Sequence, residues 1–121
     1  MPTTILIVAD HNLMRQALHE WVKIKFPGCQ VIEAAHEREA LYLAETHQPQ
    51  VVILDLALPG MDGLQAIGQF RTLLPSTKVV VLTHYDQEVH RLQASTAGAN
   101  AYLSKGKLSS ELQPLLTALL A

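Results

Sequence analysis

Five short runs of apolar and β-branched residues recur along this chain, separated by segments long enough to hold a helix. The runs cover residues 4–9, 30–34, 51–56, 78–83 and 99–103. Residues 5–8 and 79–82 are continuously apolar, which is typical of strands buried on both faces of a parallel sheet. Because successive parallel strands need a crossover connection, the alternation predicts a strand followed by a helix, repeated five times.

Apolar periodicity and helix-ending residues divide the segments between these runs. The first predicted helix ends before Pro27, the second at Gln48-Pro49 and the third before Pro75. Asp62 matches the pattern of an N-cap for the third helix. The residues expected on the buried faces of the first two helices are Leu13, Ala17, Leu18, Trp21, Val22, Ala40, Leu41 and Ala44.

The last two predicted helices have less regular patterns. In residues 86–97, Val89 and Leu92 are expected to face inward, but polar residues dilute the apolar stripe. The final segment has leucines on one face and is interrupted by Pro114, since an interior proline costs roughly 3 kcal/mol. Two alternatives stay open: either Ser109 caps a strained helix, or the helix begins at Pro114.

These elements predict one α/β domain over residues 1–121. Its five-stranded parallel sheet is expected to be doubly wound, in the flavodoxin-like order 2-1-3-4-5, with helices on both faces in three α/β/α layers. The net charge of −2 does not indicate direct binding of nucleic acid. Neither a signal peptide nor a membrane-length apolar stretch is visible, and the single Cys29 cannot form an internal disulfide. We therefore expect a cytoplasmic protein.

Polar residues stand where four of the predicted strands end. In a doubly wound sheet the functional crevice lies beyond the carboxyl ends of the strands, where the strand order reverses. Strands one, three, four and five end in Asp10, Asp55, Thr83 and Lys105. Two carboxylates would bind Mg²⁺, while a lysine and a hydroxyl would neutralise phosphoryl oxygens. Asp55 would then act as a nucleophile and form an aspartyl phosphate. Each residue alone is an ordinary strand-end polar group, so the prediction depends on their meeting at one crevice.

Four motifs carry a resemblance to a known family. Residues 52–63 hold Asp55 with Pro59 four residues and Gly63 eight residues beyond it, and residues 5–11 end in an acidic motif followed by histidine. Residues 81–83 and 101–105 supply the threonine and lysine motifs. Together they resemble the CheY-like receiver domains of bacterial response regulators over essentially the whole chain. The histidine and the Lys-Gly pair at residues 105–106 are most similar to receivers that precede a LuxR/FixJ-type helix-turn-helix domain.

The resemblance implies a role for each residue at the crevice. Asp55 would be the phosphate acceptor, phosphorylated by a partner histidine kinase in a two-component system. Asp10, Asp55 and the backbone carbonyl of Ala57 would hold Mg²⁺. Thr83 would donate a hydrogen bond to a phosphoryl oxygen, and Lys105 would pair with the carboxylate and then with the phosphate. Such a domain is not an enzyme, although it accepts a phosphoryl group and would promote its own dephosphorylation.

The resemblance also implies a switch and exposes two departures. Tyr102 matches the aromatic residue that turns inward when the switch threonine Thr83 moves, and Tyr85 matches a position that influences dephosphorylation. The family usually has a pair of acids where this sequence has Ala9 before Asp10, so Mg²⁺ binding is expected to be weaker than usual. His84 stands where a small residue is usual and is expected to crowd access to the phosphate.

The resemblance implies a kinase partner, and the composition of the last helix indicates a further one. Besides the kinase, we expect a homodimer or a C-terminal DNA-binding domain beyond this chain, because the outer face of the last helix is uncharged. The residues of that face are Gln113, Thr117, Ala118 and Ala121. Ala9 favours one alternative, a pseudo-receiver that binds partner proteins without phosphorylation. A flavin-binding protein of the same fold is a third hypothesis, disfavoured because residues 10–13 form no glycine-rich phosphate loop.

Overall fold

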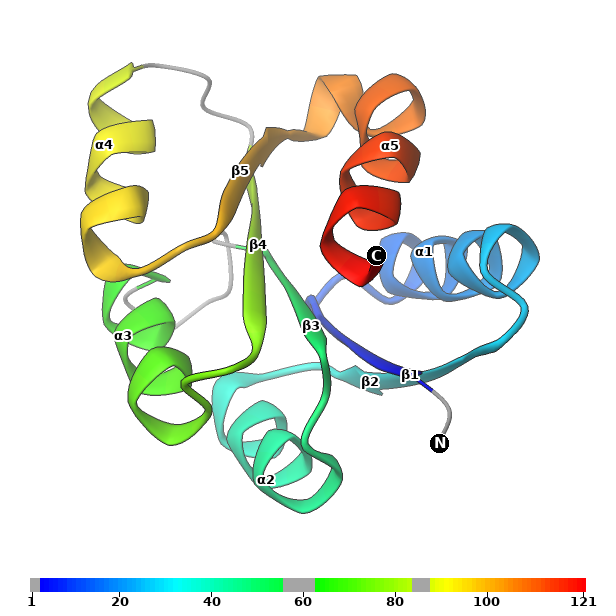
Figure 1. The fold of residues 1–121 in the computed structure, drawn as a ribbon, viewed down its shortest axis with the longest axis horizontal. Coiled ribbons are helices and arrows are strands. Elements are labelled where there is room, and N and C mark those ends of the chain that lie inside the picture. The colour runs from blue at the N-terminus through cyan, green and yellow to red at the C-terminus, as the bar shows by residue number, and fades with distance from the viewer. Residues whose placement is uncertain (1–2, 56–62, 84–87) are drawn as a thin grey trace.

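A computed structural model describes residues 3–55, 63–83 and 88–121, and these form five parallel strands flanked by helices (Figure 1). The strands are β1 Thr3–Val8, β2 Cys29–Ala34, β3 Val51–Asp55, β4 Lys78–Thr83 and β5 Ala101–Ser104. The helices are α1 Asn12–Lys25, α2 Glu37–His47, α3 Gly63–Leu73, α4 Glu88–Ala97 and α5 Leu108–Leu120, and a short 3₁₀ turn spans Lys105–Lys107. The strand order is β2-β1-β3-β4-β5, which confirms the predicted fold class.

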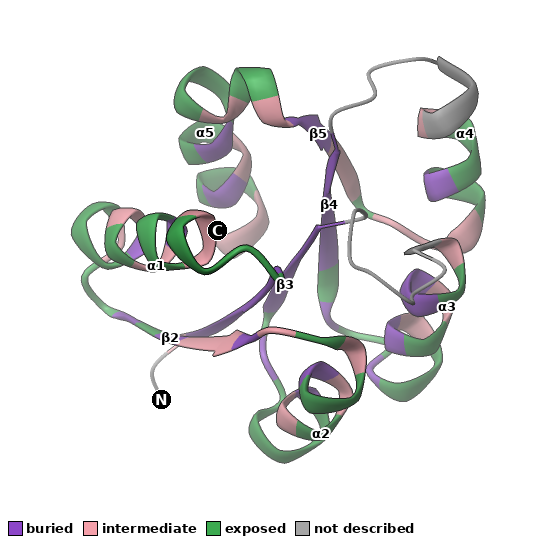
Figure 2. Ribbon diagram, turned by 180° about the vertical axis from the view of Figure 1, so that it is seen from behind, coloured by how far each residue is buried: buried purple, intermediate pink, exposed green. Residues whose placement is uncertain are grey.

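Hydrophobic layers cover both faces of the sheet. Because side chains alternate along a strand, Leu6 belongs to the core on the side of α2, α3 and α4, while its neighbour Ile7 belongs to the core beneath α1 and α5. Figure 1 shows the two groups of helices on opposite faces of the sheet, and Figure 2 shows that β3 between them is buried whereas the edge strand β2 is only partly buried. Every residue of β3 is buried, so the continuous apolar runs in the sequence reflect strands covered on both sides.

The inward face of α1 differs from the prediction at Leu13, which is 73% exposed, and at Ala17, which is also exposed. His11 is the N-cap, and its Nδ1 accepts a hydrogen bond of 3.2 Å from the Met14 N–H. Met14, Leu18 and Val22 follow one another at intervals of four residues, and all three pack into the core on this side of the sheet. Leu13 is rotated by about 100° from Met14 around the helix and therefore lies outside the buried stripe.

The expectation that Leu92 faces inward is also wrong, because its side chain is 60% exposed whereas Ala94 is fully buried. Neither alternative for the last helix holds completely. The helix α5 begins at Leu108, without a side-chain cap from Ser109, and contains Pro114 in its interior. Proline has no N–H to donate, so the helix loses a hydrogen bond at that point. Burial of leucines on either side of the proline offsets this loss.

Among the described residues, no helix has both the length and the apolar character needed to cross a membrane. Asp62, expected as the N-cap of α3, lies outside the described residues, as do Leu56, expected at the end of β3, and the first two residues of the predicted segment 86–97. The side chain of Val89 is likewise outside them.

Candidate functional site

Asp55 is the last residue of β3, and its side chain is 2% exposed. The Lys105 Nζ donates a hydrogen bond of 2.9 Å to Asp55 Oδ2, although the two residues lie 50 positions apart in the sequence. The Lys105 side chain is itself only 12% exposed. A buried carboxylate needs a charged or hydrogen-bonding partner, and the ammonium group supplies one here. The structure thus brings together two of the residues that the sequence analysis placed at the strand ends.

Thr83 ends β4 at the same edge of the sheet. Asp55 pairs with Leu82 in the β3–β4 register, so Thr83 is the next residue beyond that pair. Thr83 in turn pairs with Ser104 on β5, which directly precedes Lys105. Thr83 is 4% exposed. The sheet register therefore aligns the ends of β3, β4 and β5 at one edge, with a carboxylate, a hydroxyl and an ammonium group.

The end of β1 brings Ala9 and Asp10 to this edge. Val8 pairs with Leu54, so Ala9, which follows β1, and Asp55, which ends β3, are the next residues beyond that pair. Ala9 is 1% exposed, and its N–H donates to the Ala34 carbonyl at 3.1 Å. Asp10 is exposed in the turn between β1 and α1. A buried methyl group therefore occupies the position next to the Asp55 strand where the family pattern has its first acid.

Among residues 3–55, 63–83 and 88–121, no three histidine, cysteine, aspartate or glutamate side chains cluster closely enough to hold a metal ion. The described carboxylates at this edge are Asp10 and Asp55. Their oxygens are the donors that Mg²⁺ prefers, and Mg²⁺ keeps several waters when few protein ligands are present. The donor chemistry fits Mg²⁺, with fewer acidic ligands than the family pattern. Ala57, the expected backbone ligand, lies outside the described residues, as do His84 and Tyr85.

Tyr102 on β5 is half-buried and contacts Arg91 from α4. The Arg91 guanidinium carbon lies 5.0 Å from the centre of the Tyr102 ring, a cation–π distance, and Nη1 donates to the Tyr102 carbonyl at 3.3 Å. These contacts link α4 to the strand that ends beside Lys105.

The sequence analysis missed Arg15, which lies next to the end of β1. Its guanidinium donates to the Ala9 carbonyl and forms an ion pair with Glu33 on β2. No motif or spacing marks these two residues in the sequence. The pair becomes visible only in the fold, where the side chain of Arg15 on α1 reaches Glu33 on β2.

Comparison with known proteins identifies the family. Residues 5–117 match the response regulator receiver domain. The chain belongs to this family. A transcriptional regulatory protein of Bacillus subtilis, YhcZ, is 38% identical over 108 residues, which are 89% of this chain and 50% of that protein. The receiver domain spans about half the length of the curated relatives it matches.

Solved structures support the assignment. A two-component response regulator of the LuxR family from Aurantimonas sp. SI85-9A1 has a TM-score of 0.90 and 30% identity, covering 99% of this chain and 86% of that one. A response regulator from Burkholderia pseudomallei, solved with a phosphorylated aspartic acid, a calcium ion and citrate, has a TM-score of 0.84 and 28% identity, covering 97% and 66%.

The chain is therefore a receiver domain of a two-component response regulator, similar to those of the LuxR type. Receiver domains generally bind Mg²⁺ and are generally not enzymes. The pseudo-receiver alternative is not favoured, because the family match is accompanied by a buried carboxylate paired with lysine.

Proposed function

We propose that Asp55 accepts a phosphoryl group from a partner histidine kinase. The observation that carries this proposal is the 2.9 Å contact between Lys105 Nζ and the buried Asp55 carboxylate at the carboxyl edge of the sheet. An ammonium group at that distance can neutralise the carboxylate before the transfer. After the transfer it can bind the oxygens of the acyl phosphate.

The chemistry assigns each neighbouring residue a part. An Asp55 oxygen attacks the phosphorus of the kinase phosphohistidine, the P–N bond on the opposite side breaks, and the acyl phosphate forms as the histidine imidazole leaves. Lys105 pairs with the carboxylate before transfer and with a phosphoryl oxygen afterwards, while the Thr83 hydroxyl donates to another oxygen. Asp10, Asp55 and the Ala57 carbonyl would hold Mg²⁺, which neutralises phosphoryl charge when it is bound. The same residues support slow dephosphorylation by water.

Three positions are proposed to modulate this reaction. Ala9 weakens Mg²⁺ binding, because one acidic ligand is absent from the usual set. His84 limits the access of small phosphodonors and water, and Tyr85 influences the loss of the phosphoryl group. If His84 has this role, both phosphorylation and dephosphorylation should be faster in His84→Ala than in the wild type.

Intact-mass spectrometry tests the acceptor directly. After incubation with acetyl phosphate and Mg²⁺, the wild type should gain the mass of one phosphoryl group, and Asp55→Asn should gain none. Asp62→Asn is a matched control, since it makes the same change in the same motif and should still be modified. Equal modification of the wild type and Asp55→Asn would refute the assignment.

We also propose that this receiver belongs to a cytoplasmic regulator and is followed by a C-terminal DNA-binding domain. Within the receiver, we propose that Tyr102 changes its position when Thr83 moves. The relatives are about twice as long as this chain, and one of them is a transcriptional regulatory protein. The Arg91–Tyr102 contact supports a coupling of β5 to α4.

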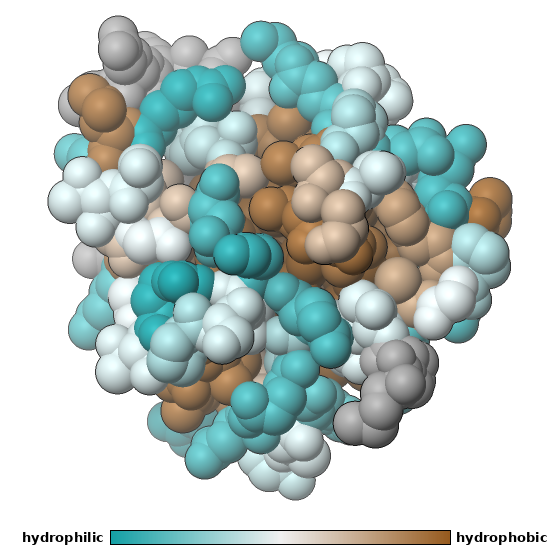
Figure 3. Space-filling model, in the orientation of Figure 1, coloured by the Kyte–Doolittle hydropathy of each residue, from teal (hydrophilic) through white to brown (hydrophobic). Residues whose placement is uncertain are grey.

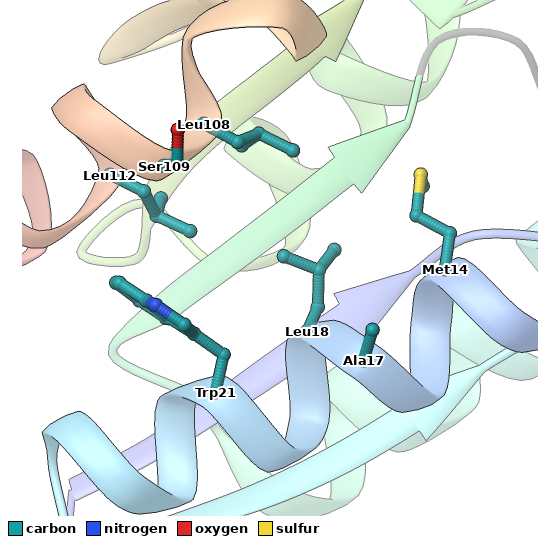
Figure 4. Close-up of a pocket in the computed structure, with 7 residues that line it drawn as sticks. All are labelled: Met14, Ala17, Leu18, Trp21, Leu108, Ser109 and Leu112. Atoms are coloured by element: carbon teal, nitrogen blue, oxygen red, sulfur yellow. The ribbon is translucent and has the colours of Figure 1, made fainter.

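An apolar surface supports the proposal of a homodimer. Figure 3 shows hydrophobic residues gathered where α1 and α5 meet, and Figure 4 shows Trp21, Leu18 and Met14 of α1 directed toward α5. The groove between the two helices has a volume of about 240 Å³. Four uncharged residues in and just beyond the second half of α5 are exposed, namely Gln113, Thr117, Ala118 and Ala121.

Light scattering coupled to size exclusion tests the dimer. A dimer through this surface should become a monomer in Ala118→Glu, because a charge would be buried at the contact. Arg38→Glu, an exposed change on the opposite face, should leave the dimer intact. A monomeric wild type would refute the dimer and leave this surface to another domain.

A further inference from the structure

Arg15 forms a three-point contact around the turn that contains Asp10. Its Nη1 donates to the Ala9 carbonyl at 2.7 Å, and its Nη2 donates to Asn12 Oδ1 at 2.7 Å. Its Nε donates to Glu33 Oε1 at 2.8 Å. The first two acceptors belong to residues on either side of Asp10. The guanidinium group therefore bridges the turn from which the Asp10 side chain extends.

The anchor of this contact is part of the sheet. Glu33 lies on β2, where it pairs with Ile7 of β1. Its second oxygen, Oε2, lies 2.6 Å from His19 Nδ1, so both carboxylate oxygens have a partner. The Arg15 and Glu33 side chains are 14% and 27% exposed, which reduces the screening of their charges by water. Glu33 thus fixes the guanidinium against a rigid element.

We propose that Arg15 is a positioning residue for Asp10, which it holds ready to bind Mg²⁺. This inference rests on the proposed role of Asp10 as a metal ligand. Since Ala9 supplies no acid, Asp10 is the only carboxylate that the end of β1 offers. A ligand on a turn that is already ordered loses less conformational entropy when the ion binds. Order in this turn therefore contributes to affinity.

The charge of Arg15 acts in the opposite direction and makes the proposal testable. A guanidinium near the site repels a cation, although the ion pair with Glu33 offsets much of that repulsion. If charge dominated, removing Arg15 would tighten Mg²⁺ binding. If positioning dominates, the same change weakens binding. The sign of the effect therefore distinguishes the two roles.

Mg²⁺ titration by calorimetry, with the Asp10 amide signal followed by NMR, measures this sign on the folded protein. Arg15→Gln should weaken Mg²⁺ binding by about tenfold, the effect typical of a residue that supports a metal ligand. Arg15→Lys keeps the charge but lacks the planar fork needed for three directed contacts, so it should also bind Mg²⁺ less tightly. Arg38→Gln removes the same charge from an exposed position on α2 and should change the affinity little.

The outcomes separate this proposal from the proposed function. A wild type that neither binds Mg²⁺ nor accepts a phosphoryl group would refute the proposed function itself. Normal wild-type binding, with equal or tighter binding in Arg15→Gln, would refute the positioning role alone. Should Arg15→Gln fail to fold, wild-type affinity in Arg15→Lys would refute the role in the same way.

Discussion

Asp55 and Lys105 form the most deeply buried ion pair among the described residues. The carboxylate is 2% exposed and the lysine side chain 12% exposed, so the two partners differ in their access to water. Removing the lysine would leave a buried charge without its ammonium partner. Removing the carboxylate would leave a long, flexible side chain that can reach solvent. The two truncations should therefore have unequal effects on stability.

Lys105→Met should lower the free energy of unfolding by about 3 kcal/mol, because the buried Asp55 carboxylate loses the charge and the hydrogen bond of the ammonium group. Asp55→Asn should cost distinctly less. Urea denaturation measures both, with Lys107→Met as the control, since Lys107 is exposed and the same change there should alter stability by less than about 0.5 kcal/mol. Equal losses in Lys105→Met and Lys107→Met would mean that the pair contributes little to the fold.

An acid added at position 9 should raise the affinity for Mg²⁺ and lower the stability of the metal-free protein. Ala9→Asp adds an acid at a position that is 1% exposed and next to the Asp55 strand. Mg²⁺ should bind more tightly, and the metal-free protein should lose about 1–3 kcal/mol through desolvation and like-charge repulsion. Calorimetric titration and urea denaturation measure the two effects. Gln93→Asp, which adds an acid at an exposed site on α4, should produce neither effect, and an unchanged Mg²⁺ affinity in Ala9→Asp would show that the missing acid is immaterial.

At the scale of elements, α3, α4 and the turns that follow them are joined around Arg71. Its Nη2 donates to the Pro75 carbonyl at 3.0 Å, and its Nη1 donates to the Thr77 carbonyl. The stem of the same side chain fills the space beside Gly98, the residue that ends α4. Gly98 has φ +115°, a conformation that residues with a Cβ rarely adopt.

Gly98→Ala should therefore destabilise the fold by about 1–3 kcal/mol, because the new methyl group would lie 2.5 Å from Arg71 Cγ in a strained backbone conformation. Gly68→Ala is the matched control. Gly68 lies inside α3, with nothing within 4 Å of an added Cβ, so alanine should leave stability unchanged or raise it by up to about 1 kcal/mol. Thermal unfolding of both variants measures the contrast. Similar shifts in both would argue against the Arg71 contact.

The strands were the most predictable elements, because residues buried on both faces leave continuous apolar runs such as 5–8 and 79–82. Helix faces were harder. Leu13 and Leu92 are apolar but exposed, so hydrophobicity alone did not identify the stripe that contacts the sheet. Pro114 indicated a helix boundary, yet packing of α5 against the sheet outweighed the local cost. Local sequence predicts burial well only where the whole element is enclosed.

For the whole molecule, topology explains what the sequence could reveal about the site. Asp55 and Lys105 could be placed together because parallel strands bring their carboxyl ends to one edge. Arg15 and Glu33 meet through side chains of α1 and β2, and nothing in their spacing predicts that contact. Site residues at the ends of strands can therefore be predicted from the sequence through the topology of the sheet. Residues that support them through tertiary contacts cannot.

The single cysteine reports on the folding of the whole domain. Cys29 lies on β2 and is 9% exposed. Burial raises the pKa of its thiol, an effect that the nearby charge of Lys23 partly opposes. The folded protein thus holds this proton more tightly than the unfolded chain does. Stability should consequently fall as pH rises from just below the ordinary thiol pKa through the raised pKa of the folded state.

Cys29→Ala should remove this part of the pH dependence while adding a loss of stability that does not vary with pH. The unfolding free energies of the wild type and Cys29→Ala are measured across mildly alkaline pH and subtracted. The subtraction cancels the titration of the lysines and tyrosines that both proteins share. That difference should shrink as pH rises, because the wild type alone loses thiol-linked stability. In native protein the thiol should also react slowly with a disulfide reagent, and quickly in urea. A difference that stays constant with pH would show that folding does not perturb the Cys29 thiol.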